Sequence, residues 1–181
     1  MLVANDISAA RTVRLKHLLD GQGLTGVDIK TGDARALGSV MTSCFDRVLA
    51  DVPCSGEGRL VRARAEAWST WSERSIVGLA KRQLRLLESA CRCLRVGGEV
   101  LYATCTMAPE ENEGVLHQFL ERRERRGDLH MSLVPIEWRV NQRRPAITRW
   151  RETVYREEVH QAVRLVAGEG MTPFFMARMR R

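Results

Sequence analysis

Apolar and polar positions follow two alternating patterns along the chain, one typical of strands and one typical of helices. Short apolar runs predict strands, whereas apolar residues at steps of three and four predict amphipathic helices. The strand-like runs lie at 1–4, 27–30, 45–50, 99–104, 133–136, 162–166 and 174–179. Helical spacing occurs at 8–20, 72–94 and after Pro109. Because strands and helices alternate, the pattern predicts an α/β protein with a mostly parallel, doubly wound sheet.

Residues with strong positional preferences mark the ends of the predicted helices. Ser8 can cap the first helix, and the Gly-Gly pair at 97–98 is expected to end the second. Pro109, followed by two glutamates, predicts the start of the third helix. Its Arg-rich end, 121–126, is expected to fray as a solvated helix end.

Composition indicates one globular domain, and the charge points to an anionic partner. The 181 residues are 44% hydrophobic and 28% charged, so 1–181 is expected to bury a core as a single, partial domain. Lys and Arg outnumber Asp and Glu by 29 to 22, a net charge of +7 that favours nucleic acid. No apolar run is long enough to span a membrane, and no membrane partner is expected. The Arg-rich stretch 137–161 reads as an insertion that either clamps RNA or packs on the domain.

The five cysteines form an odd and irregular set, which indicates reduced thiols in an intracellular protein. They are Cys44, Cys54, Cys91, Cys93 and Cys105. Neither a disulfide framework nor a zinc site is expected from this spacing, and no other metal site is predicted. Three of them are expected to be small buried hydrophobes. Cys54 and Cys105 differ, because each follows a predicted strand in a polar loop where a thiolate can be stabilised.

Three aspartates also follow predicted strands. They are Asp6, Asp33 and Asp51. The carboxyl ends of parallel strands meet at one edge of the sheet, where α/β proteins bind ligands, and carboxylates there can accept ribose hydroxyls or an adenine amino group. Each aspartate alone can equally be a turn or cap residue. The sequence lacks the usual Gly-rich phosphate turn after the first strand, so a cofactor without phosphates fits better than NAD or ATP.

Three segments carry a resemblance to a known enzyme family. They are VANDIS at 3–8, DVPCSGEG at 51–58 and GGEVLYATCTMAPEENE at 97–113. Together they resemble the S-adenosylmethionine-dependent RNA cytosine-5 methyltransferases of the Nop2/Sun (Fmu) family, and the similarity extends to the helix at 78–87 and the terminal PFFMARMRR. The resemblance implies a Rossmann-like class I methyltransferase fold, S-adenosyl-L-methionine as cofactor, and rRNA or tRNA as substrate. The ribosomal subunit and its assembly factors are further candidate partners.

The resemblance also implies roles for individual residues. Cys105, in Thr-Cys, would be the nucleophile that adds to C6 of cytosine and thereby activates C5. Cys54, in Pro-Cys, would assist product release, and Asp51 would contact N3 of the base and lie near the methyl donor. Asp6 would bind the ribose of the cofactor, and Asp33 would lie near its adenine. Because the base must leave its stack, flipped or single-stranded RNA is the expected substrate.

Two features refine this expectation. DNA cytosine-5 methyltransferases use the Pro-Cys cysteine as nucleophile, so the additional Thr-Cys cysteine favours RNA, and it disfavours a methyltransferase of DNA or protein. Arg59, Arg62 and Arg64 follow the Pro-Cys loop, and we expect them to contact RNA phosphates.

The chain departs from the family at its start. The family's first cofactor motif, a strand followed by a PGGKT-like turn, should precede 3–8, and the chain begins after it. The strands ending at Asp6 and Asp51 are therefore expected to lack a shared neighbour, and residues 1–181 alone to bind the cofactor weakly or not at all. Three explanations stay open: a fragment of a full enzyme, a partner that completes the sheet, or an inactive homologue that binds RNA or assists ribosome assembly. The cytoplasm, the mitochondrion and the nucleolus stay open as compartments.

Overall fold

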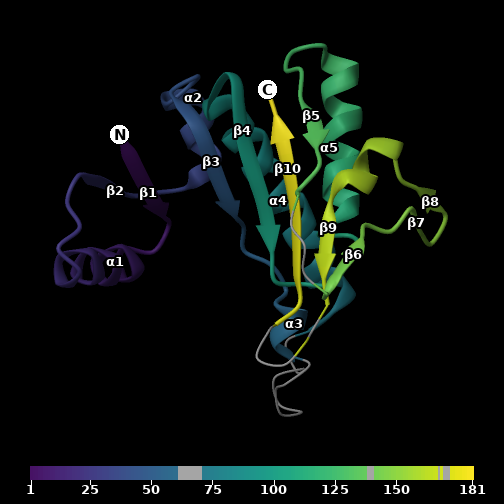
Figure 1. The fold of residues 1–181 in the computed structure, drawn as a ribbon, viewed down its shortest axis with the longest axis horizontal. Coiled ribbons are helices and arrows are strands. Elements are labelled where there is room, and N and C mark those ends of the chain that lie inside the picture. Colours follow the sequence, from purple (N-terminus) through teal and green to yellow (C-terminus); the bar gives the residue numbers. More distant parts are fainter. Residues whose placement is uncertain (61–70, 138–140, 167, 169–171) are drawn as a thin grey trace.

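A computed structural model describes residues 1–60, 71–137, 141–166, 168 and 172–181 (Figure 1). The strands are β1 (Leu2–Asp6), β2 (Val27–Thr31), β3 (Phe45–Asp51), β4 (Leu94–Thr104), β5 (Ser132–Val134), β6 (Arg143–Pro145), β7 (Arg149–Trp150), β8 (Thr153–Val154), β9 (Val163–Leu165) and β10 (Phe174–Arg180). The helices are α1 (Ala9–Gly21), α2 (Leu37–Val40), α3 (Glu57–Leu60), α4 (Glu73–Cys93) and α5 (Glu113–Arg126), with short 3-10 helices η1 (Ala34–Ala36) and η3 (Glu157–Gln161). Each strand predicted from the sequence is present, which confirms the α/β class.

The described strands form a main sheet, a separate parallel pair, and a short antiparallel pair of β7 with β8. The main sheet has the order β3-β4-β10-β9-β6, with β5 also paired to β10. β1 pairs with β2, and β3 with β4, in parallel register. The pairings of β10 with β4, β5 and β9, and of β9 with β6, are antiparallel. The expectation of a mostly parallel sheet therefore holds for the strands that carry the aspartates, whereas the C-terminal strands make the described sheet mixed.

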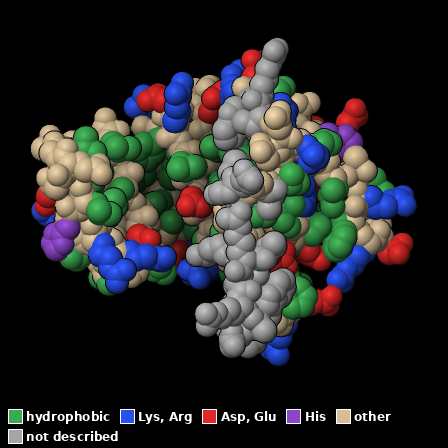
Figure 2. All heavy atoms as spheres, turned by 60° about the horizontal axis from the view of Figure 1, so that its bottom comes forward, with side chains coloured by type: hydrophobic (Ala, Val, Ile, Leu, Met, Phe, Trp, Pro, Cys, Tyr) green, Lys and Arg blue, Asp and Glu red, His purple; other side chains and the backbone are tan. Residues whose placement is uncertain are grey.

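The β1–α1–β2 segment, residues 2–31, forms an N-terminal unit beside the main sheet (Figure 1). Within the described residues β1 pairs only with β2, and β3 only with β4, so the strands that end at Asp6 and Asp51 share no neighbour. This prediction is confirmed by the pairing. Leu2 and Leu49 are 61% and 68% exposed on these strands. In Figure 2, hydrophobic side chains line both sides of the hollow between the N-terminal unit and the rest of the molecule.

The core lies where α4 and α5 pack against the main sheet. The apolar stripe of α4 predicts its buried face, and Leu84 and Leu87 are buried there as the spacing requires. Phe119 from α5 and Tyr102 and Phe175 from the sheet complete this core, each fully buried. Burying such a side chain contributes about 1.5–3 kcal/mol, so this packing fixes the part of the fold that carries both candidate cysteines.

Helix α4 ends within one residue of the predicted position, but β4 begins five residues earlier than predicted. β4 begins at Leu94, which is fully buried and pairs with Phe45, so the Gly-Gly pair at 97–98 lies inside the strand. The register shifts there, Gly97 has φ +81°, and a Cβ on Gly98 would meet the Asp46 carbonyl oxygen at 3.1 Å. The glycines therefore allow a bulge and a close strand approach rather than ending the helix.

Both ends of α5 also differ from the expectation. The helix begins at Glu113 instead of Pro109, because the side chains of the preceding residues are held in tertiary hydrogen bonds described below. At its other end the Arg-rich stretch 121–126 does not fray and continues to a left-handed Gly127. Arg123 in this stretch is buried and pairs with Glu88 and Asp128, so it is not part of a solvated end.

Candidate active site

The two cysteines singled out from the sequence meet at the carboxyl ends of β3 and β4. The parallel register pairs Asp51 with Ala103, which places Cys54 and Cys105 in neighbouring loops. Their sulfur atoms are 3.1 Å apart, and the Cys105 backbone N–H donates a hydrogen bond of 3.3 Å to the Cys54 sulfur. Both residues are half-buried. A thiol pair at this edge can present one sulfur to a substrate while the other exchanges a proton.

The surroundings make Cys54 the protonated member of the pair. Burial, reinforced by the hydrogen bond with Cys105, raises the pKa of the Cys54 thiol to about 12. At neutral pH this thiol therefore retains its proton and can donate it to the Cys105 sulfur. A thiol that retains its proton is a poor nucleophile, so the arrangement favours attack by the other sulfur.

A buried carboxylate fixes the loop that carries Cys54. The Ser55 backbone N–H donates to Glu111 Oε2 at 3.0 Å, and Gln83 Nε2 donates to the same oxygen at 2.7 Å. Gln83 Nε2 also donates to the Pro53 carbonyl oxygen at 2.9 Å, so α4 holds the loop on both sides of Cys54. Glu111 and Gln83 are fully buried, and burial raises the pKa of Glu111.

A second set of hydrogen bonds holds the loop that carries Cys105. Thr104 donates to Asn112 Oδ1 at 2.6 Å, and Asn112 Nδ2 donates to the Thr106 carbonyl oxygen at 3.0 Å. The Thr106 and Ser55 hydroxyls are 2.8 Å apart and join the two loops. The Gly58 N–H donates to the Cys105 carbonyl oxygen, and a Cβ at Gly58 would lie only 2.7 Å from that oxygen, so glycine is required there.

Sequence reasoning missed the supporting residues Gln83, Glu111 and Asn112. The signal was present, since Gln83 and the segment containing the other two belong to the stretches that resemble the family. Two adjacent glutamates, Glu110 and Glu111, are typical of a helix start. The pattern therefore gives no sign that Glu111 is buried beside the Cys54 loop.

The three aspartates lie at strand ends, but in different surroundings. Asp6 Oδ1 accepts the Ser8 N–H at 2.7 Å and Arg11 Nε at 3.0 Å. Asp33 caps η1, and the guanidinium of Arg35 binds both of its oxygens and lowers the pKa of Asp33 to about 2. Asp51 is exposed, and within the described residues nothing contacts its carboxylate. It ends β3 three positions before Cys54 and is therefore free to meet a ligand.

The predicted RNA contacts are only partly described. Arg62 and Arg64 lie outside the described residues, and of Arg59 only its place in α3 is described. In the Arg-rich stretch 137–161, the part from 141 onward lies on the domain. There Trp150 donates to Glu110 and Arg151 pairs with Glu73, so this part contacts the rest of the chain.

Comparison with known proteins agrees with this geometry. The profile of the family described as 16S rRNA methyltransferase RsmB/F matches residues 1–180. The chain belongs to the RsmB/F methyltransferase family. The resemblance noted in the sequence to the Nop2/Sun enzymes is thereby confirmed.

Two curated relatives in this family carry the name ribosomal RNA small subunit methyltransferase F. The protein of Klebsiella pneumoniae is 39% identical over 121 residues, which are 67% of this chain and 25% of that protein. The protein of Aeromonas salmonicida is 41% identical over 122 residues, which are also 67% of this chain and 25% of that protein. The chain thus spans about a quarter of the length of the curated relatives it matches.

Solved structures confirm the fold. NSun6 from Pyrococcus horikoshii superimposes on this RsmB/F chain with a TM-score of 0.77 and 26% sequence identity. The match covers 98% of this chain and 40% of the NSun6 chain. A methyltransferase homologue from the same organism gives a TM-score of 0.73 and 27% identity, over 99% and 52%. The predicted Rossmann-like class I methyltransferase fold is therefore confirmed.

Two observations concern membrane spans and cellular compartment. Among the described residues no helix is both long and apolar enough to cross a membrane. The two curated relatives are bacterial, so they give no support to a mitochondrial or nucleolar location.

Proposed function

We propose that the protein is the catalytic part of an RNA cytosine-5 methyltransferase that uses S-adenosyl-L-methionine. The observation that carries this proposal is the thiol pair, Cys54 and Cys105, with sulfur atoms 3.1 Å apart at the carboxyl ends of neighbouring parallel strands. Membership of the RsmB/F family supports small-subunit rRNA as the RNA. Two relatives named for methylation of that RNA support the same substrate.

Cys105 is the proposed nucleophile. Its sulfur forms a bond to C6 of the cytosine, and the electron pair of the C5–C6 double bond moves to make C5 electron-rich. Asp51 stabilises this adduct by donating a proton to N3 of the base, because its carboxyl group is exposed and has no hydrogen-bond or ion-pair partner among the described residues. After the methyl group is in place, a water molecule takes the proton from C5, and the electron pair of that C–H bond re-forms the C5–C6 double bond as the sulfur–C6 bond breaks. Cys54, which is protonated at neutral pH, donates to the departing Cys105 sulfur.

The strand-end carboxylates fit a nucleoside cofactor in part. S-adenosyl-L-methionine, when bound, supplies an electrophilic methyl group. Oδ1 of Asp6 accepts hydrogen bonds from Ser8 and Arg11. Oδ2 has no partner among the described residues, so this oxygen can accept a hydrogen bond from a ribose hydroxyl. Asp33 could receive an adenine amino group only after Arg35 releases one of its oxygens. NSun6 from Pyrococcus horikoshii, solved with the S-adenosylmethionine analogue SFG, supports this cofactor class.

A second candidate function is RNA binding without catalysis, as in an assembly protein. It is favoured by the net charge of +7, which attracts RNA whether or not the chain is catalytic. The preserved set of Asp51, Cys54 and Cys105 favours the enzyme.

Methyl transfer tests the proposal directly. The chain is incubated with small-subunit rRNA and radiolabelled S-adenosylmethionine, and the label is located as 5-methylcytosine after nuclease digestion. Because residues 1–181 are expected to bind the cofactor weakly, the assay is run at high cofactor concentration. There we expect slow transfer by the wild type, none by Cys105→Ala, and for Cys54→Ala an RNA–protein adduct that persists in denaturing gels. Cys44→Ala is the matched control, because Cys44 lies away from the site before β3. Transfer by Cys105→Ala would exclude the assigned nucleophile. RNA binding without label in wild type would favour the assembly protein.

A further inference from the structure

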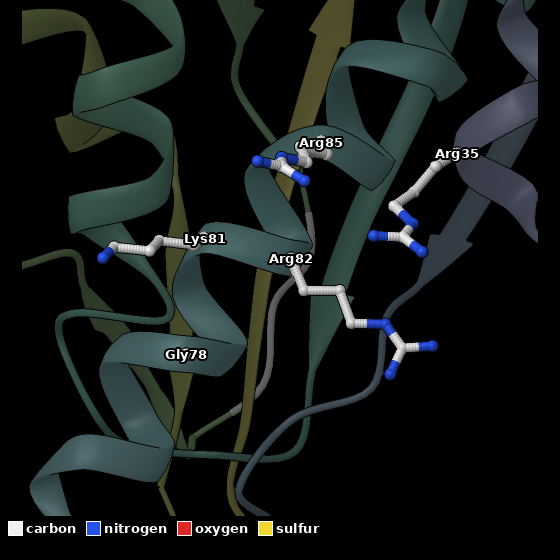
Figure 3. Close-up of a pocket in the computed structure, with 5 residues that line it drawn as sticks. All are labelled: Arg35, Gly78, Lys81, Arg82 and Arg85. Carbon is white, nitrogen blue, oxygen red and sulfur yellow. The ribbon is translucent and has the colours of Figure 1, made fainter.

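A shallow cationic pocket lies between η1 and α4, separate from the cysteine pair. It encloses about 330 Å³ and is lined by Arg35, Gly78, Lys81, Arg82 and Arg85. Figure 3 shows the guanidinium groups of Arg35 and Arg82 on the same side of α4, with Lys81 extending to the other side. Four of the five lining residues are cations, and none is acidic or aromatic. The pocket can therefore attract anions, and it holds no aromatic ring on which a base could stack.

Most of the positive charge of this pocket has no acidic partner within salt-bridge distance among the residues that the structure describes. Lys81, Arg82 and Arg85 form no salt bridge with any described residue, and only Arg35 has an acidic partner, Asp33. The Nε of Arg82 is buried without a hydrogen-bond partner in the described part of the chain.

A second hollow allows a comparison of how the cations are paired. It lies at the ends of β3 and β4 that are farther from the cysteine pair. Arginines also line it, but there Arg95 pairs with Asp46, and Arg178 and Arg180 both pair with Glu99. Three of the four arginines of this second hollow thus have an acidic partner, whereas only one of the four cations of the first pocket has one among the described residues. An external anion is the natural counter-charge for the first pocket.

We infer that the pocket of η1 and α4 binds the phosphate backbone of the substrate RNA. This inference rests on the proposed function, which makes RNA the substrate. The cations extend to both sides of α4, so they suit an extended polyanion rather than a single small anion. The pocket is also linked to the active site, since Gln83 lies between the pocket residues on α4 and its amide holds the Cys54 loop. RNA held there is therefore positioned by the same helix that fixes the catalytic loop.

Charge removal with a matched control tests the inference. Binding of a fluorescent single-stranded oligoribonucleotide is measured by anisotropy at several salt concentrations. For Lys81→Gln/Arg82→Gln/Arg85→Gln we expect Kd to rise about tenfold, and the slope of log K against log salt to fall by roughly 0.7 for each lost contact. The control Lys16→Gln/Lys30→Gln/Arg95→Gln removes the same charge from exposed residues that have acidic partners, and should bind nearly as the wild type.

Gly78 allows a second test that leaves the cations in place. A Cβ at this position would meet nothing within 4 Å, so both Gly78→Ala and Gly78→Glu can be accommodated. Gly78→Glu brings an anion into the pocket and should weaken RNA binding, whereas Gly78→Ala should not. Circular dichroism verifies that each variant is folded.

Three results would overturn the inference: equal losses in the triple variant and its control, equal binding by the two Gly78 variants, or full competition by inorganic phosphate. The last would indicate a site for small anions. Cys44→Ala, which lies away from both the pocket and the cysteine pair, should bind RNA as the wild type does. Pocket-dependent binding without methyl transfer would reject the proposed activity but not the pocket.

Discussion

At the scale of single residues, the site depends on which groups keep their protons. Burial acts on Cys54 and on Glu111 in the same sense, since it disfavours the charged form of each and raises both pKa values. The sequence identified Cys54, because its position after a strand and its Pro-Cys context were visible. It did not reveal Glu111, because the burial of a glutamate depends on contacts with Pro53–Ser55 and α4 that only the folded chain brings together.

Thiol alkylation should separate the two cysteines of the pair. We expect iodoacetamide at pH 8 to label Cys105 well before Cys54, since the pKa of Cys54 lies near 12. Peptide mass spectrometry measures the labelled fraction at each position over time, and guanidinium-unfolded protein, in which the two rates should converge, is the control. Faster labelling of Cys54 than of Cys105 would contradict the assignment of the protonated thiol.

Glu111→Gln should alter the pH dependence of stability. The raised pKa means that the folded state holds the Glu111 proton more tightly than the unfolded state, whose pKa is near 4.5. Stability contributed by this group is therefore present below about pH 4.5 and is lost as pH rises through the folded pKa. In thermal unfolding, the Tm of the wild type should fall relative to that of Glu111→Gln as the pH rises from about 4.5 through the folded pKa. Parallel curves for the two proteins would refute the prediction.

At the scale of elements, tertiary contacts set the boundaries that the sequence misplaced. Periodicity located α4 because its stripe of apolar residues is regular, and Ser8 and Ser72 cap α1 and α4 as their side chains favour. The start of α5 was misplaced because Glu111 and Asn112 are held by other elements. A sequence pattern reports local preference, and these residues satisfy distant partners instead.

The start of α5 is also tied to β9 by a buried ion pair. Arg164 Nη2 lies 2.5 Å from Glu113 Oε2, and the two side chains are 8% and 0% exposed. Arg164→Met should destabilise the chain by about 3–5 kcal/mol, because it leaves the Glu113 charge buried alone. Glu113→Gln/Arg164→Met should recover much of the loss in urea unfolding. A single variant as stable as the wild type would show that the pair does not join these elements.

At the scale of the whole molecule, the chain divides into a well-packed part and a weakly packed one. The sequence predicted the α/β class and the gap between the strands ending at Asp6 and Asp51, because family motifs fix strand order. It did not predict the antiparallel pairings around β10, since a short apolar run does not encode the direction of its neighbour. The cysteine pair lies entirely in the well-packed part, so its geometry does not depend on the N-terminal unit.

The N-terminal unit, residues 2–31, should open far more readily than the main sheet. It has only two strands, and Thr12 is the only residue of α1 that is buried. Hydrogen exchange should therefore be fast in β1 and β2 and slow in β4 and β10. Leu18, 63% exposed, and Leu84, 2% exposed, form a matched pair.

Leu18→Ala should change the free energy of unfolding by less than about 0.5 kcal/mol, and Leu84→Ala should lower it by about 2–5 kcal/mol. Equal protection of β1 and β4, together with a large effect of Leu18→Ala, would mean that the unit is anchored by contacts beyond those described. Fast exchange confined to the unit would confirm that residues 2–31 open without unfolding the main sheet.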